Sequence, residues 1–141
     1  MHHDYIRYLK DHNPTVRVLK LDNAPLIISF LFLRFKKDNR VVIADAELTT
    51  GLADYLYALR EQQGEAAYPG SARDYLTAWT NDGFLRKFYP TDSDEPVFEL
   101  TPAMEKALDW IKDLERKEFV GTESPAPTRV DSSGYRKGRL L

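Results

Sequence analysis

The stretch that decides the fold is residues 84–102. It reads Phe84-Leu85-Arg86-Lys87-Phe88-Tyr89, then Pro90-Thr91-Asp92-Ser93-Asp94-Glu95-Pro96, then Val97-Phe98-Glu99-Leu100, and ends on Thr101-Pro102. Two apolar runs flank an acidic, proline-bounded loop, which predicts a β-hairpin with strands at about 84–89 and 97–100. Thr101-Pro102 is typical of a helix start, because threonine caps free N–H groups and proline fits the first turn. We therefore expect a wing followed by a last helix.

The residues before the hairpin predict the helices that a winged helix needs. Helical spacing of leucines predicts a helix at about 46–63, capped by Asp45 and ended by Gly64. Ser71, with Asp74 three residues later, starts a helix at about 72–81 in the recognition position. Val41-Val42-Ile43 predicts a short edge strand. The expected fold is mainly α with a small β-hairpin: a winged-helix domain with extra N-terminal helices.

The first 37 residues predict three helices at about 3–12, 14–21 and 24–37, divided by Asn13-Pro14 and Asn23-Ala24-Pro25. The third is apolar around most of its circumference, so more than one of its faces needs cover. Either the two short helices or a partner protein provides that cover. We place the domain at 1–120, with extra helices at 1–37, the winged-helix core at 41–117 and an irregular tail at 121–141.

Composition limits the classes of function. The 141 residues contain no cysteine and no apolar run long enough to span a bilayer, and the N-terminus lacks the pattern of a signal peptide. We expect a cytoplasmic protein without membrane association. Residues 1–40 hold eight Lys/Arg and four Asp/Glu, net +4, whereas residues 41–100 hold four and eleven, net −7. The acidic middle weighs against nucleic-acid binding.

No catalytic, cofactor or metal pattern is found in the sequence. The three histidines, His2, His3 and His12, lie near the N-terminus without carboxylates spaced to complete a metal site. The glycines form no phosphate-binding loop, and no serine-hydrolase or zinc-protease motif occurs. The acidic residues at 92–95 fit a solvated wing tip better than a cation site. We predict no enzymatic activity, no cofactor and no metal.

Two kinds of binding function stay open. For DNA, the expected recognition helix offers only Arg73, offset by Asp74. The candidate weak DNA contacts are Arg34, Lys36, Lys37 and Arg40. A solvated helix end with cations near its C-terminus is the alternative account of those four. A free-standing winged-helix DNA-binding regulator is the alternative function.

For protein binding, residues 1–37 carry more apolar surface than one core face uses. We predict a homodimer built on this segment. The candidate interface residues are Tyr5, Tyr8, Leu9, Phe30 and Leu33. The competing hypothesis is internal packing of the three helices, which would leave a monomer.

Six segments resemble, in the same order, the N-terminal region of the JetA kleisins of Wadjet, a condensin-like bacterial SMC complex, which are related to the MksF and MukF kleisins. They are Leu21–Leu31 (LDNAPLIISFL), Asp54–Arg60 (DYLYALR), Tyr68–Leu76 (YPGSARDYL), Leu85–Tyr89 (LRKFY), Asp94–Ala103 (DEPVFELTPA) and Glu118–Ser124 (EFVGTES). The resemblance covers about residues 4–124 and implies a winged-helix N-terminal domain, agreeing with the pattern above.

The resemblance also implies a role in complex assembly and plasmid defence. Such a kleisin bridges SMC ATPase subunits and recruits a KITE-type winged-helix subunit, while its N-terminal domain is associated with pairing of complexes. ATP hydrolysis and DNA cleavage belong to other subunits, so no catalytic residue is implied here. JetA-like proteins are much longer, and this chain departs from them at Pro125-Ala126-Pro127. We expect a truncated or frame-shifted product, or a fragment, without the downstream SMC- and KITE-binding regions.

Overall fold

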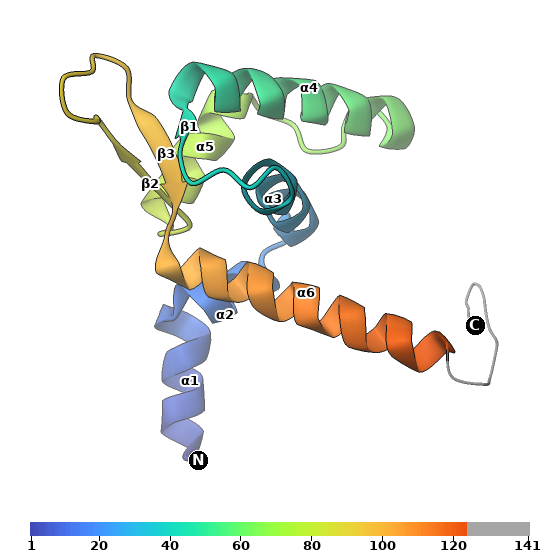
Figure 1. Cartoon of the computed structure of the whole chain (residues 1–141). Coiled ribbons are helices and arrows are strands. Elements are labelled where there is room, and N and C mark those ends of the chain that lie inside the picture. The colour runs from blue at the N-terminus through green and yellow to red at the C-terminus, as the bar shows by residue number, and fades with distance from the viewer. Residues whose placement is uncertain (124–141) are drawn as a thin grey trace. The chain divides into compact units, whose positions relative to one another are not determined.

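The computed structural model describes the backbone of residues 1–123 and the side chains of residues 1–118. This part of the chain is mainly helical, with a small antiparallel sheet (Figure 1). The elements are α1 (His3–His12), α2 (Pro14–Lys20), α3 (Ala24–Leu31), η1 (Phe32–Lys37), β1 (Ile43–Ala44), α4 (Asp45–Gln63), α5 (Ala72–Asn81), β2 (Leu85–Phe88), β3 (Val97–Leu100) and α6 (Pro102–Glu123). Two compact units divide the chain, Met1–Ala107 and a second that starts at Leu108, within α6.

The predicted hairpin is confirmed and gains a third strand. β2 and β3 pair antiparallel, with Leu85 opposite Leu100 and Phe88 opposite Val97. β1 pairs with the other edge of β3, so the strand order is β1-β3-β2. The predicted edge strand at 41–43 is shifted, because the partner positions on β3 fix pairing at Ile43–Ala44. Val41 lies outside the strand and is 79% exposed.

Local capping signals position most helices as predicted. The Ser71 hydroxyl accepts a hydrogen bond from the Asp74 N–H at 3.1 Å, and the Thr101 hydroxyl accepts one from the Met104 N–H at 3.2 Å. Asn13 caps α2 through the Val16 N–H. The prediction for Asp45 is wrong: Asp45 is the first residue of α4, and Ala44 precedes it without a side-chain cap. Its carboxylate instead accepts hydrogen bonds from Arg73, at 3.3 Å for the shorter one.

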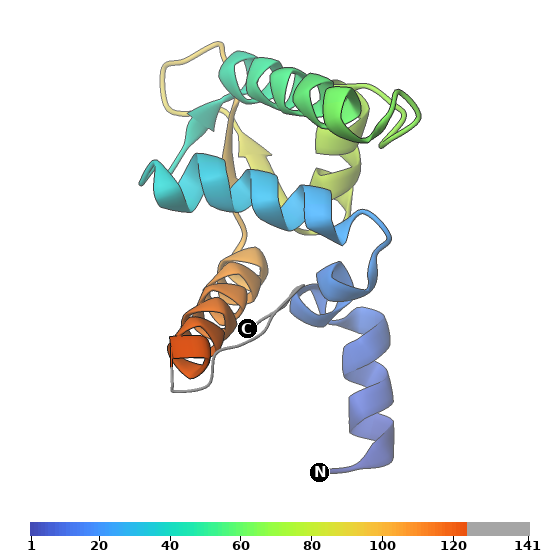
Figure 2. The same cartoon turned by 90° about the vertical axis from the view of Figure 1, so that its right-hand side faces the viewer.

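The apolar segment at 24–37 is covered from inside the chain. It is not one α-helix, because α3 ends at Leu31 and a π-helical segment, η1, continues to Lys37. The buried residues along it are Leu26, Ile27, Phe30, Leu31 and Phe35. The Phe30 ring lies 5.3 Å from the Tyr55 ring of α4 and 6.4 Å from the Trp79 ring of α5, centroid to centroid. Helices α2, α4 and α5 surround α3 in the first unit (Figures 1 and 2).

The C-terminal boundary differs from the prediction. α6 continues to Glu123, so residues 121–123 are helical and do not begin an irregular tail. The rest of that prediction, residues 124–141, lies outside the described residues. Within residues 1–123, no helix is both long and apolar enough to cross a membrane.

Candidate protein interface

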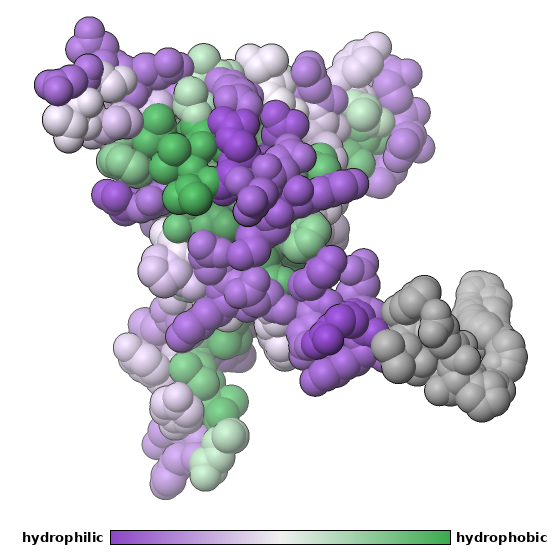
Figure 3. Space-filling model, in the orientation of Figure 1, coloured by the Kyte–Doolittle hydropathy of each residue, from purple (hydrophilic) through white to green (hydrophobic). Residues whose placement is uncertain are grey.

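The N-terminal helix presents an apolar face that its own chain covers only in part. Tyr5, Ile6, Tyr8 and Leu9 share one side of α1 by helical spacing, and the charged residues occupy the other side. α1 has no buried residue. Tyr5 is 54%, Ile6 43% and Tyr8 60% exposed, while Leu9 is half-buried. In Figure 3, green hydrophobic atoms lie along α1 among white and purple ones. Such a cluster on a helix is typical of a protein-binding surface.

The base of α1 is held by α2, which is fixed to the core. α1 ends where the Asn13 N–H donates to the Leu9 carbonyl. In α2, the Thr15 hydroxyl donates to the Ala103 carbonyl at 2.7 Å, and Val18 is fully buried. Arg17 approaches Asp82 to 3.6 Å. These contacts attach α2 to the core, and they leave the apolar face of α1 available to a partner.

The five predicted interface residues do not lie together. Tyr5, Tyr8 and Leu9 share α1, as predicted. Phe30 is a correction: it is 0% exposed and belongs to the core between α3, α4 and α5. Leu33 is half-buried in η1. Helical periodicity identified both as apolar-face residues, but it does not tell which protein supplies the cover. Sequence reasoning missed Ile6, whose apolar side chain directly after Tyr5 was the available signal.

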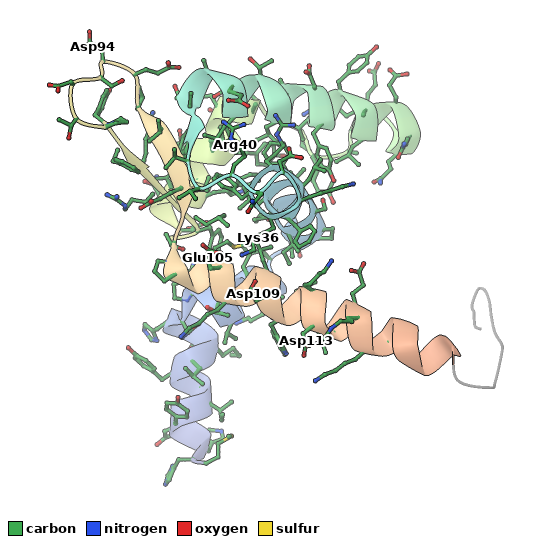
Figure 4. All side chains as sticks on the ribbon, viewed as in Figure 1. Lys36, Arg40, Asp94, Glu105, Asp109 and Asp113 are labelled. Atoms are coloured by element: carbon green, nitrogen blue, oxygen red, sulfur yellow. The ribbon has the colours of Figure 1, made fainter. Side chains whose placement is uncertain are left out.

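Of the four predicted DNA contacts, Arg34, Lys36 and Lys37 lie in η1 and Arg40 follows it. Three of the four are paired with carboxylates. Arg40 makes two hydrogen bonds to Glu47, at 2.8 and 3.0 Å. Lys36 contacts Glu105 of α6 at 2.7 Å (Figure 4), and Arg34 lies 4.0 Å from Glu47. The fourth, Lys37, is exposed and forms no ion pair among the described residues.

The Arg40–Glu47 pair changes the titration of both groups. The hydrogen bond to Glu47 raises the pKa of Arg40. The hydrogen bond from Arg40 lowers the pKa of Glu47. Both shifts favour the charged pair, so Glu47 offsets part of the positive charge that Arg40 would offer to a phosphate.

The predicted recognition helix and wing offer little free positive charge. Arg73 of α5 and Lys87 of β2 both face Asp45, at 3.3 and 4.0 Å. Arg86 pairs with Glu99 across the hairpin. The wing loop is acidic, and Figure 4 shows Asp94 at its far end. A nucleic-acid backbone brought against this surface would meet carboxylates and neutralised cations.

Comparisons with known proteins place the chain in a family. The family model described as "Protein of unknown function (DUF3375)" matches residues 8–128. The chain belongs to the DUF3375 family. The match begins within α1 and includes Tyr8 and Leu9 of its apolar face, together with every later element described above.

One relative aligns with nearly the whole chain. A protein of Mycolicibacterium smegmatis (strain ATCC 700084 / mc(2)155), described as an uncharacterized protein, is 42% identical over 132 residues. The aligned part is 92% of this chain and 28% of that protein, so the chain spans less than a third of its relative's length. No solved structure gives a significant match.

Proposed function

We propose that this chain is a non-catalytic assembly module that works by binding another protein, as the N-terminal domain of a Wadjet-type kleisin does. The observation that carries the proposal is α1, which has no buried residue although Tyr5, Ile6 and Tyr8 are large and apolar. Exposing such a face to water costs free energy that a bound partner recovers. The proposed partner is a second copy of the chain.

We also assign the winged-helix topology as part of this proposal. Its support is the element order: α3, β1, α4, α5, the β2–β3 hairpin and α6. In this assignment the hairpin is the wing, β1 is the third strand, and α5 holds the recognition position. Helices α1 and α2 are then additions at the N-terminus, and α1 is the addition with the exposed apolar face.

The kleisin assignment is supported by the six segments that resemble JetA in the same order. In this proposal the larger complex includes an SMC ATPase and a KITE-type subunit, acts in plasmid defence and resides in the cytoplasm. Catalysis belongs to those other subunits, and this chain supplies no catalytic group. A DNA-binding regulator is the weaker proposal, because the cations at Arg34, Lys36 and Arg40 are held by Glu47 and Glu105.

Sedimentation velocity across the micromolar range tests the self-association. We expect the wild-type chain to form a dimer, and Tyr8→Asp to shift it to monomer without loss of helical circular dichroism. Tyr89→Asp is the matched control, because Tyr89 is 64% exposed and lies just beyond β2, away from α1. A wild-type chain that stays monomeric across the range contradicts the proposal.

A further inference from the structure

A second helix face without a partner lies on α4. Its inner stripe, Leu48, Leu52 and Leu56, is buried. The opposite side carries Asp54, Tyr57 and Glu61, which share one face at i, i+3 and i+7 and are all exposed. Tyr57 is 66% exposed, and Ala53, one turn before it on the same side, is small and exposed. This outer face of α4 therefore offers one large aromatic ring between two carboxylates.

The outer face of α4 and the turn after it carry more negative than positive charge. Asp54, Glu61 and Glu65 form no ion pair among the described residues. The nearest cation in sequence, Arg60, donates hydrogen bonds to the carbonyls of Ala67, Tyr68 and Gly70 at 2.6–3.2 Å. A hollow of about 380 Å³ beside the Tyr57 ring is lined by one cation, Arg60, and by two carboxylates, Glu61 and Glu65, together with Pro69 and Gly70. A partner that fits this face brings an apolar side chain and positive charge.

The N-terminal helices have the complementary pattern. The edge of α1 beside Ile6 carries Lys10, and Lys20 of α2 adjoins it, with the Lys20 Nζ 3.2 Å from the Lys10 carbonyl. Neither ammonium group is in an ion pair among residues 1–118. The opposite edge, beside Tyr8, carries Asp4 and Asp11. Since only one edge is basic, the apolar face of α1 has one electrostatically favourable orientation on an acidic surface.

The positions of the two faces exclude a contact between them within one copy. α1 and α4 lie at opposite ends of the Met1–Ala107 unit in both views (Figures 1 and 2), so α1 does not meet α4 of its own chain. Two copies placed antiparallel about a two-fold axis bring each α1 beside the other copy's α4. A two-fold contact of this kind closes on itself and contains both surfaces twice.

We infer that α1 of one copy docks on the outer face of α4 of a second copy, in a reciprocal two-fold dimer. Tyr5 and Tyr8 pack against Tyr57 and its hollow, and the Lys10–Lys20 edge faces Asp54 and Glu61. This inference rests on the self-association proposed above and adds its second surface.

Charge reversal tests the docking. The first variant is Lys10→Glu with Lys20→Glu, and the second is Asp54→Lys with Glu61→Lys. Each variant alone places like charges at both contacts, and we expect its dissociation constant, measured by sedimentation, to rise about tenfold. An equimolar mixture should recover wild-type affinity, because the mixed dimer has one native and one reversed contact, both attractive. Recovery also shows that both variants are folded.

Asp92→Lys with Asp94→Lys on the wing loop is the matched control, since it changes the net charge as the α4 variant does. We expect it to dimerise normally alone. Its mixed dimer with the Lys10/Lys20 variant should stay weaker than wild type, because that dimer has one native and one like-charge contact. Recovery of full wild-type affinity in this mixed dimer would assign the effect to net charge and overturn the inference. An α4 variant that dimerises normally, while Tyr8→Asp is monomeric, would also overturn it and would leave self-association through another surface. A monomeric wild-type chain would remove both proposals.

Discussion

Replacing Phe30 by alanine tests whether Phe30 is a core residue or an interface residue. Phe30 is fully buried, and its ring approaches those of Tyr55 and Trp79. Truncation therefore leaves a cavity where α3, α4 and α5 meet, and we expect a loss of about 3–5 kcal/mol in the free energy of unfolding. With a urea dependence of about 2 kcal/mol per molar, the midpoint falls by roughly 2 M. A loss of this size is a large fraction of the stability of a small domain.

Tryptophan fluorescence in a urea titration measures this loss. Trp79 is 1% exposed and Trp110 is 50% exposed, so a Trp110→Phe background lets the emission report on the ring next to Phe30. Tyr8→Ala is the control: at a concentration where the chain is monomeric, we expect it to change stability by less than about 0.5 kcal/mol. A loss of less than about 1 kcal/mol, accompanied by separation of subunits, would return Phe30 to the interface.

Three further results are expected. The chain should bind duplex DNA weakly, without sequence preference and with steep loss as salt rises in fluorescence anisotropy; selective binding at physiological salt would favour the regulator. Thr101→Ala should lower the free energy of unfolding by about 1–2 kcal/mol, because the hydroxyl both caps α6 and donates to the Gly83 carbonyl at 2.7 Å; Thr50→Ala, on the exposed side of α4, is the control. Since the folded-state pKa of Glu47 is lowered, its contribution is present above its ordinary pKa of 4.5 and is lost as pH falls through the folded value. The stability difference between wild type and Glu47→Gln in urea should therefore shrink on acidification, and an unchanged difference would contradict this assignment.

Local sequence signals predicted the helix starts because the hydrogen bonds that cap a helix join residues close together in the sequence. The Ser71 and Thr101 caps each join a hydroxyl to an N–H three residues away, and the structure has both bonds. The prediction for Asp45 was wrong because its partner, Arg73, lies 28 residues away. The edge strand was displaced for the same reason: pairing with β3 selects Ile43, and the β-branched run at 41–42 does not. The sequence pattern thus predicted where the helices and strands lie better than it predicted which residues their side chains contact.

At the candidate interface, too, the sequence pattern predicted helix faces but not the residues or proteins that cover them. Amphipathic spacing was enough to select Tyr5, Tyr8 and Leu9, since a helix face follows from periodicity alone. It also selected Phe30, because a core face and an interface face have the same apolar pattern. The ion pairs of Arg40 with Glu47 and of Lys36 with Glu105 join segments that have no local relation, so the four cations could not be recognised as mostly neutralised.

These ion pairs explain why the first 40 residues are basic and the middle of the chain is acidic. Arg17, Arg34, Lys36 and Arg40 belong to the basic first 40 residues, and each contacts a carboxylate from a later segment, at 2.7–4.0 Å. The charge that would attract a phosphate backbone instead joins the N-terminal segment to the rest of the first unit. What stays unpaired is mostly acidic, on the outer face of α4 and the wing loop, apart from lysines such as Lys10 and Lys20. We propose that a surface with this residual charge disfavours nucleic acid and favours a basic protein edge such as the Lys10–Lys20 edge of α1 and α2.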